Sequence, residues 1–135
     1  MKTKLVRNIL IVIAVLLIGW WLLLPSKSHH EAGIRRVDAV EFREVIKNDA
    51  VKVIDVRSSE EHQQGFIPGT DFNFDVKSQS FKQKVIEALP QGATVAIYCR
   101  SGNRSQKAAA LLAEQGFQVI ELSTGFKGWK ELEEK

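Results

Sequence analysis

The sequence has 135 residues, with 19 Lys and Arg against 16 Asp and Glu, so its formal net charge is +3. This length suits one domain of ordinary size and excludes two catalytic domains on the chain. Residues 1–36 carry six of the basic side chains and only one of the acidic ones, so the rest of the chain is slightly acidic. A slightly acidic globular part excludes nucleic acid as an expected partner.

Cysteine and histidine are scarce in this sequence. Cys99 is the single cysteine, so no disulfide can form within the chain. The three histidines and the one cysteine do not have the spacing of a zinc site, and no metal site is predicted.

The N-terminal segment is strongly apolar. Residues 9–24 form the uninterrupted run ILIVIAVLLIGWWLLL, which follows three basic side chains. As a helix, the segment from Leu5 to Leu24 has a length of about 30 Å, which is enough to span a bilayer. Two adjacent tryptophans near its far end suit a membrane interface. We therefore predict that residues 1–24 are a basic tail followed by a single membrane-spanning helix.

The basic tail also predicts an orientation. Basic residues of a short tail prefer the cytoplasmic side, so the rest of the chain is expected outside the cytoplasm, on the periplasmic side in a bacterium. The alternative is a cleaved signal peptide and a protein secreted to the periplasm. The residues after the apolar run lack a clear A-x-A-like cleavage site, and this favours a retained anchor.

A polar linker is predicted next, over residues 25–33 with the sequence PSKSHHEAG. The folded domain is then expected over 34–135. Asp38 can cap a helix that runs to Ile46. The run VKVIDVR, residues 51–57, is rich in β-branched side chains and predicts a buried strand.

Helices and strands alternate along the rest of the domain. The remaining predicted elements are a helix over 59–64, a helix over 80–89, a strand over 94–98, a helix over 104–115, a strand over 118–122 and a last helix with Trp129 and Leu132. This alternation predicts an α/β domain whose mainly parallel sheet is flanked by helices.

The single thiol lies directly after a predicted buried strand and shortly before a predicted helix. In parallel sheets, ligands bind beyond the C-terminal ends of strands, where backbone N–H groups of a loop and a helix N-terminus converge. We expect this setting to lower the pKa of Cys99 and to hold it as a nucleophilic thiolate, with Arg100 and Arg104 adding positive charge. Gly102 permits a tight turn, and Ser101 and Ser105 offer hydroxyl donors.

Three segments resemble the rhodanese family. CRSGNRS at 99–105 resembles the active-site loop of single-domain rhodaneses. VIDVRSSEEHQQGFIPGT at 53–70 is similar to the family's D-V-R-x-x-x-E-[YF]-x-x-G-H-I-P-G-A segment, and TGFKGW at 124–129 resembles its terminal G-G-x-x-x-W. The resemblance covers nearly everything from Ile34 onward and implies a rhodanese-like domain.

The resemblance also implies a chemistry without a cofactor. The Cys99 thiolate would take a sulfane sulfur from a small anion such as thiosulfate and pass it on, as a persulfide, to cyanide or a thiol. The residues that the resemblance and the loop pattern place around the substrate are Arg100, Ser101, Gly102, Asn103, Arg104 and Ser105.

Three positions depart from the family pattern. His62 replaces Tyr or Phe, Phe66 replaces His, and Thr124 replaces the first Gly of the terminal motif. These differences are expected to affect packing and donor preference more than sulfur transfer.

Asp55 and Arg57 form a charged pair at a strand end, and we interpret them as a supporting structural network.

Two alternative functions stay open at this level. For the related phosphatases and arsenate reductases, the resemblance implies a Cys-x5-Arg loop. Cys99 and Arg104 enclose only four residues, and this disfavours that chemistry. A persulfide carrier that serves a membrane or periplasmic protein would need the same residues as an enzyme for small molecules. The sequence does not separate these two.

Overall fold

The computed structural model describes residues 1–23 and 33–135, with side chains up to residue 20 in the N-terminal helix. The elements in chain order are α1 (Lys2–Leu23), β1 (Ile34–Val37), α2 (Ala39–Val45), β2 (Lys52–Asp55), α3 (Ser59–Gln63), β3 (Phe72–Asn73), α4 (Phe81–Ala88), β4 (Thr94–Tyr98), α5 (Asn103–Glu114), β5 (Gln118–Leu122) and α6 (Gly125–Glu133).

Helix α1 is the one helix among the described residues that is long and apolar enough to cross a membrane, over Lys2–Trp20. Its apolar side chains are exposed, and none of this window is buried against the rest of the protein. A signal sequence near the N-terminus can meet the same criteria of length and hydropathy. The predicted linker, residues 25–33, lies outside the described residues except for Gly33.

The five strands form one sheet in the order β1-β5-β4-β2-β3, and every pair in it is parallel. The predicted parallel α/β domain is confirmed. Two edge strands, β1 and β3, were not predicted. The sequence IRRV of β1 has two Arg in its middle, and β3 has only two residues. Pairing with a neighbouring strand defines them, because neither has the apolar pattern of a buried strand.

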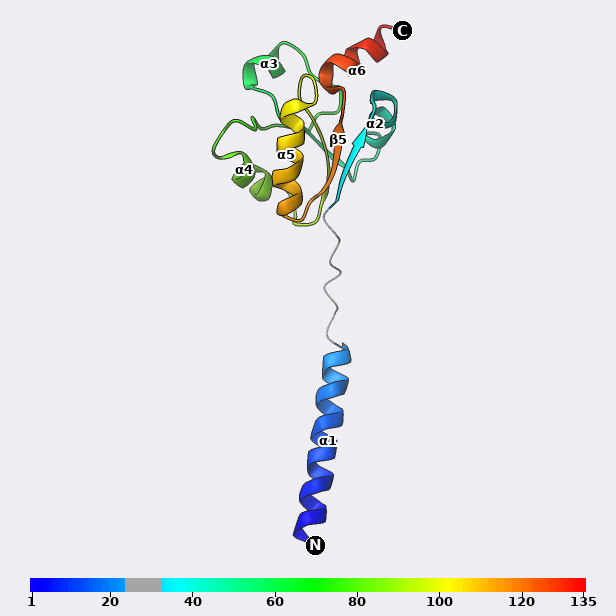
Figure 1. Cartoon of the computed structure of the whole chain (residues 1–135), viewed down its shortest axis with the longest axis vertical. Helices are drawn as coiled ribbons and strands as arrows, with labels where there is room; N and C mark the ends of the chain where they lie inside the picture. The colour runs from blue at the N-terminus through cyan, green and yellow to red at the C-terminus, as the bar shows by residue number, and fades with distance from the viewer. Residues whose placement is uncertain (24–32) are drawn as a thin grey trace.

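Helices cover both faces of the sheet, as Figure 1 shows, with α4 and α5 on one face and α2 and α6 on the other. Side chains alternate between these faces along β4. Val95 and Ile97 pack in the cluster of α4 and α5, and Cys99 continues that side of the strand. Ala96 and Tyr98 pack in the cluster of α2 and α6. The thiol therefore lies over the face that α5 covers.

Local hydrogen bonds set the element boundaries. Asp38 caps α2 as predicted, because its carboxylate accepts from the Glu41 N–H at 2.9 Å. Ser58 and Glu61 form a reciprocal capping box at α3. The predicted strand over 51–57 was too long at its end: the Arg57 N–H bonds the Asp55 side chain at 2.9 Å instead of a neighbouring strand.

Candidate active site

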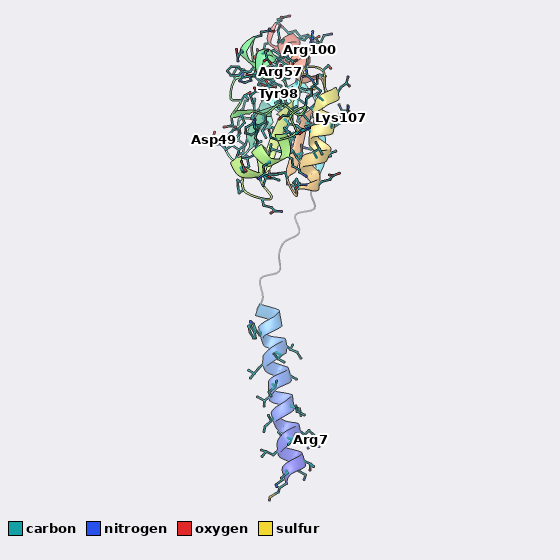
Figure 2. All side chains as sticks on the ribbon, turned by 90° about the vertical axis from the view of Figure 1, so that its left-hand side faces the viewer. Arg7, Asp49, Arg57, Tyr98, Arg100 and Lys107 are labelled. Carbon is teal, nitrogen blue, oxygen red and sulfur yellow. The ribbon has the colours of Figure 1, made fainter. Side chains whose placement is uncertain are left out.

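The loop after β4 begins at Cys99 and meets the first turn of α5. It lies at the C-terminal end of the middle strand of the sheet, where the ends of β2 and β5 also converge. Figure 2 shows Arg57, Tyr98 and Arg100 at this end of the domain. The sequence predicted this place for the thiol.

The Cys99 thiol is buried, with 1% of the residue exposed. The Gly102 N–H donates to its sulfur at 3.1 Å, and Sγ lies 3.4 Å from the Ser105 hydroxyl oxygen. Burial alone raises the pKa of the thiol, but the Ser105 hydroxyl and the backbone N–H groups of Ser105, Ser101 and Gly102 outweigh it. The net pKa is lowered, so the site favours the thiolate more than water does.

Glycines let two backbones approach closely in the loop. Gly102 has φ of +95° and Gly125 has φ of +63°, a left-handed conformation that other residues rarely adopt. A Cβ on Gly125 would lie 2.5 Å from the carbonyl group of Arg100, and one on Gly102 would overlap the Ser123 carbonyl oxygen. The sequence predicted that Gly102 permits a tight turn, and the close approach of the Ser123 carbonyl explains why a side chain does not fit there.

The first turn of α6 orients the peptide groups of the loop. The Phe126 N–H donates to the Cys99 carbonyl at 2.8 Å, and the Lys127 N–H donates to the Arg100 carbonyl at 3.0 Å. Within a trans peptide the C=O and the next N–H point in opposite directions. Since α6 holds the Arg100 carbonyl, the Ser101 N–H is left to face the sulfur. Sequence reasoning missed this role, although the TGFKGW motif was its signal.

Arg104 is not a free cation beside the thiol. Its guanidinium donates to both carboxylate oxygens of Glu61, at 2.6 and 2.7 Å. This pairing, above all the hydrogen bond from Arg104, lowers the pKa of Glu61 to about 2. Glu61 was not expected in the site, because it is 43 residues from Arg104 in the sequence.

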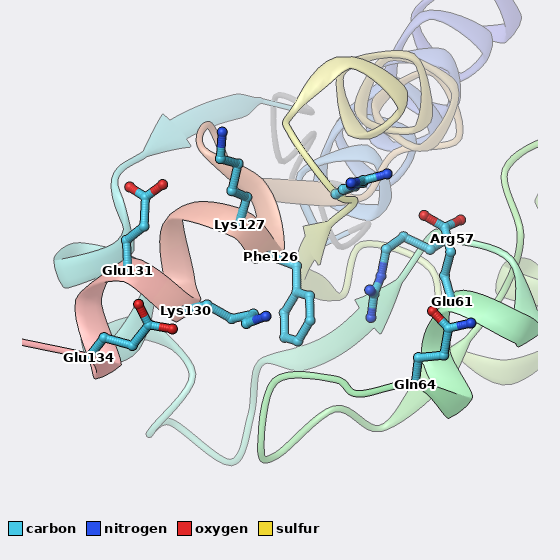
Figure 3. Close-up of a pocket in the computed structure, with 9 residues that line it drawn as sticks. Arg57, Glu61, Gln64, Phe126, Lys127, Lys130, Glu131 and Glu134 are labelled. Carbon is cyan, nitrogen blue, oxygen red and sulfur yellow. The ribbon is translucent and has the colours of Figure 1, made fainter.

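Arg100 differs from Arg104 because it is exposed and lines an open pocket. The pocket has a volume of about 480 Å³ and lies between α3, the loop and α6. Lys127 and Lys130 add positive charge to it, and Glu131 and Glu134 of the same helix add negative charge. Figure 3 shows the Phe126 ring between the side chains of Lys130 and Arg57. The remaining predicted loop residues, Ser101 and Asn103, are exposed.

Asp55 and Arg57 form a buried network at the end of β2. The Arg57 guanidinium donates to both Asp55 carboxylate oxygens and to the Gly65 carbonyl, the latter at 2.7 Å. His62 Nδ1 lies 2.9 Å from the same carboxylate, and the guanidinium lies 4.4 Å from the Phe126 ring centre. The pair therefore connects the segment after α3 with Phe126 of α6.

The departures from the family pattern have local partners. The rings of His62 and Phe66 stack with their centres 4.3 Å apart, so the two changes on this segment fit each other. Thr124 fills the place in which a Cβ of residue 128 would lie, and residue 128 is a glycine. These contacts are packing contacts at the rim of the site.

A buried carboxylate was also missed. Glu121, on β5, is fully buried and accepts hydrogen bonds from the Ser105 hydroxyl and from Arg36 Nε, each at 2.5 Å. The signal was a charged residue within the apolar strand sequence QVIEL. Glu121 thus contacts the hydroxyl that contacts the thiol.

Comparison with known proteins assigns the family. Residues 38–132 match the family model described as Rhodanese-like domain, which is well over half of the chain. The chain belongs to the rhodanese-like domain family. Among the described residues of this rhodanese-like domain, no group of three or more His, Cys, Asp or Glu side chains is placed to hold a metal ion.

Curated relatives of the rhodanese-like chain have different sizes. It is 33% identical over 91 residues to thiosulfate sulfurtransferase GlpE of Pseudomonas fluorescens, covering 67% of this chain and 80% of that protein. It is 35% identical over 88 residues to tRNA uridine(34) hydroxylase of Cytophaga hutchinsonii, covering 64% of this chain. The chain spans only 28% of the hydroxylase and 54% of another relative, so it matches one part of those proteins.

Solved structures share the fold. The crystal structure of a rhodanese-related protein from Thermoplasma volcanium matches with a TM-score of 0.62 and 30% identity. The match covers 73% of this chain and 92% of that chain.

The ion pair of Glu61 and Arg104 predicts a pH-dependent stability. The pKa of Glu61 falls from 4.5 to about 2 on folding, so the pair stabilises the fold fully above about pH 4.5. This stabilisation is lost as the pH falls towards 2. We expect the free energy of unfolding of the wild type to exceed that of Glu61→Gln near neutral pH, and the difference to shrink across this window.

Denaturant unfolding at a series of pH values measures this difference. Glu60→Gln is the matched control, because it removes the same charge from the adjacent, exposed position of α3 and leaves the pair with Arg104 intact. A difference for Glu61→Gln that stays constant down to pH 2 would contradict the ion pair.

Proposed function

We propose that this chain is a sulfurtransferase that carries a sulfane sulfur on Cys99. A small anion such as thiosulfate is the donor, and a thiol or cyanide is the acceptor. The observation that carries the proposal is the buried thiol at the end of β4, with the Gly102 N–H on its sulfur and a lowered pKa. Membership of the rhodanese-like family and a relative named thiosulfate sulfurtransferase support it.

The proposed reaction has two displacements at sulfur. The Cys99 thiolate attacks the sulfane sulfur of thiosulfate, the S–S bond of the donor breaks, and sulfite leaves with the electron pair. The acceptor then attacks the outer sulfur of the persulfide, and Cys99 leaves as a thiolate. Backbone N–H groups stabilise the negative sulfur in both steps, and their orientation does not change because α6 holds the loop carbonyls.

The pocket beside the loop suits an anionic donor. Basic and acidic side chains both line it, but in the described part of the chain no carboxylate is paired with Arg100. Arg100 can therefore offer its guanidinium donors to a bound anion. Arg104, which Glu61 binds, is proposed to hold the start of α5, from which the Ser105 hydroxyl reaches the thiol.

The geometry of Arg104 supports sulfur transfer over the phosphatase or arsenate reductase alternative. Those reactions require an arginine that encloses a tetrahedral oxyanion at the thiol, and the resemblance implies one more residue in their loop. Here the guanidinium is engaged by both oxygens of Glu61.

We also propose the arrangement of the whole chain. Residues 1–24 anchor it in a membrane, 25–33 are a linker and 34–135 are the catalytic domain, outside the cytoplasm. The exposed apolar side chains of α1 and the basic residues at its start support the anchor.

Loading of Cys99 is the direct test of the reaction. Incubation with thiosulfate should make the chain one sulfur atom heavier by mass spectrometry, and Cys99→Ser should not gain that mass. Because Cys99 is the single cysteine, no other thiol competes for the sulfur. Equal loading of the two proteins would contradict the proposal.

Arg100→Ala tests donor recognition. A hydrogen bond to a charged group contributes roughly 1.5 to 3 kcal/mol, so kcat/KM for thiosulfate should fall about tenfold or more, mainly through KM. Lys107→Ala is the control, since it removes a positive charge from the exposed side of α5, farther from this end of the domain (Figure 2). Equal losses in the two variants would show only a general effect of charge.

Membrane extraction and protease access test the anchor. The full chain should resist carbonate washing and need detergent for release, while a chain without residues 1–32 should be soluble and as active. Protease added outside an intact inner membrane should digest the domain. Release of a mature chain that starts after the apolar run would show a cleaved signal peptide, and protection from protease would show the opposite orientation.

A further inference from the structure

Glu121 is a buried acid beside the reactive thiol, and strand pairing explains its position. In the register of β1 and β5, Arg36 lies directly across from Glu121. Arg36 Nε donates to one carboxylate oxygen at 2.5 Å and the Ser105 hydroxyl donates to the other at 2.5 Å. The Glu121 side chain is fully buried, whereas 45% of the Arg36 side chain is exposed. These two donors replace hydrogen bonds that the carboxylate would otherwise make with water.

Ser105 has one hydroxyl proton and two neighbours that can accept it. Glu121 Oε1 is 2.5 Å from its oxygen, and Cys99 Sγ is 3.4 Å from it. While the proton is given to Glu121, the Ser105 oxygen presents a lone pair to the sulfur and accepts from the S–H group. A thiolate has no proton to donate, so Ser105 stabilises it only by turning its own proton away from Glu121.

We propose that Glu121 is a positioning residue that competes with Cys99 for the Ser105 hydroxyl proton and thereby limits how readily the thiolate forms. When the thiol loses its proton to water, Ser105 turns its proton from the carboxylate to the sulfur. Glu121 then keeps its hydrogen bond from Arg36. Only hydrogen bonds exchange in this step, and no covalent bond besides S–H is broken.

The charged groups around the hydrogen bonds that connect Glu121, Ser105 and Cys99 come from three elements. Arg36 on β1 neutralises Glu121 and so weakens its hold on the Ser105 proton. Arg104 on α5 interacts with the charge of Cys99, while Glu61 at α3 binds the Arg104 guanidinium. Because oxidants attack the thiolate, the competition by Glu121 also limits oxidation of Cys99 when no donor is bound.

The test is a titration of thiolate absorbance in the ultraviolet, with the full chain in detergent micelles. Cys99 is the single cysteine, so the thiolate signal has one source. Tyr98 is the single tyrosine, and burial raises its pKa to about 12, so it does not absorb as a phenolate in the range used.

Glu121→Gln keeps the size of the side chain and removes its charge. The midpoint of the thiolate titration should fall by about one pH unit, which is roughly tenfold more thiolate at a pH below the midpoint. In a Ser105→Ala background the same change should shift the midpoint by less than half as much. An unmoved midpoint would show a merely structural Glu121, and equal shifts in both backgrounds would show that Ser105 is not the intermediary; either result overturns the proposal.

Arg36→Gln tests the same competition at the other partner of Glu121. The Arg36 side chain is partly exposed, so the fold tolerates this change better than a change at Glu121. Gln at this position removes the cation and keeps a hydrogen-bond donor for the buried carboxylate, so the hold of Glu121 on the Ser105 proton strengthens and the midpoint should rise. Arg35→Gln is the matched control: it removes the same charge from the adjacent position of β1, where Arg35 pairs with Glu41 at 3.0 Å. An unmoved midpoint in Arg36→Gln, or an equal rise in Arg35→Gln, would overturn the proposal.

This inference rests on the proposed function, in which Cys99 is the reacting group, but its test needs no sulfur donor. Failure of the wild type to gain sulfur from thiosulfate would contradict the function and leave the titration result standing. A titration that does not respond to Glu121 or Arg36 would overturn the role of Glu121 alone.

Discussion

Two backbone hydrogen bonds from the first turn of α6 to the carbonyls of Cys99 and Arg100 hold the active-site loop in shape. They turn the loop carbonyls away from the sulfur and leave the N–H groups facing it. The contact requires two backbones to approach without side chains between them, and Gly125 meets that requirement. The shape of the loop around the thiol therefore depends on a helix that begins 26 residues later in the chain, and the TGFKGW motif is a part of the candidate active site.

Three arginines near the loop are each paired with a carboxylate, so their positive charge is largely neutralised. Arg57 is bound by Asp55, Arg104 by Glu61, and Arg36 by Glu121. Positive charge from Arg100 and Arg104 was expected to lower the pKa of the thiol, but hydrogen bonds from Ser105 and from backbone N–H groups are the main causes that lower it. A fixed backbone dipole at hydrogen-bond distance acts more strongly on a buried sulfur than an arginine already neutralised by a carboxylate. Arg100 is left to meet a ligand at the pocket.

The chain keeps its fold through the replacements at the rim of the site because neighbouring positions fit them. The imidazole of His62 bonds the Asp55 carboxylate and stacks on the ring of Phe66. Thr124 needs the space that Gly128 leaves free. These contacts lie outside the loop from Cys99 to Ser105, which keeps its own hydrogen bonds.

The sequence by itself determined the alternation of buried strands and helices, the cap at Asp38, and the place of Cys99 after a buried strand, because these follow from local patterns of apolar residues and turn-forming residues. It did not reveal the edge strands β1 and β3, which have no apolar pattern and form only by pairing with a neighbour. Nor did it reveal the partners of Arg104 and Arg36, which are 43 and 85 residues away. Tertiary structure alone decided those contacts, because strand register and helix packing, and not sequence spacing, bring such distant side chains within hydrogen-bond distance.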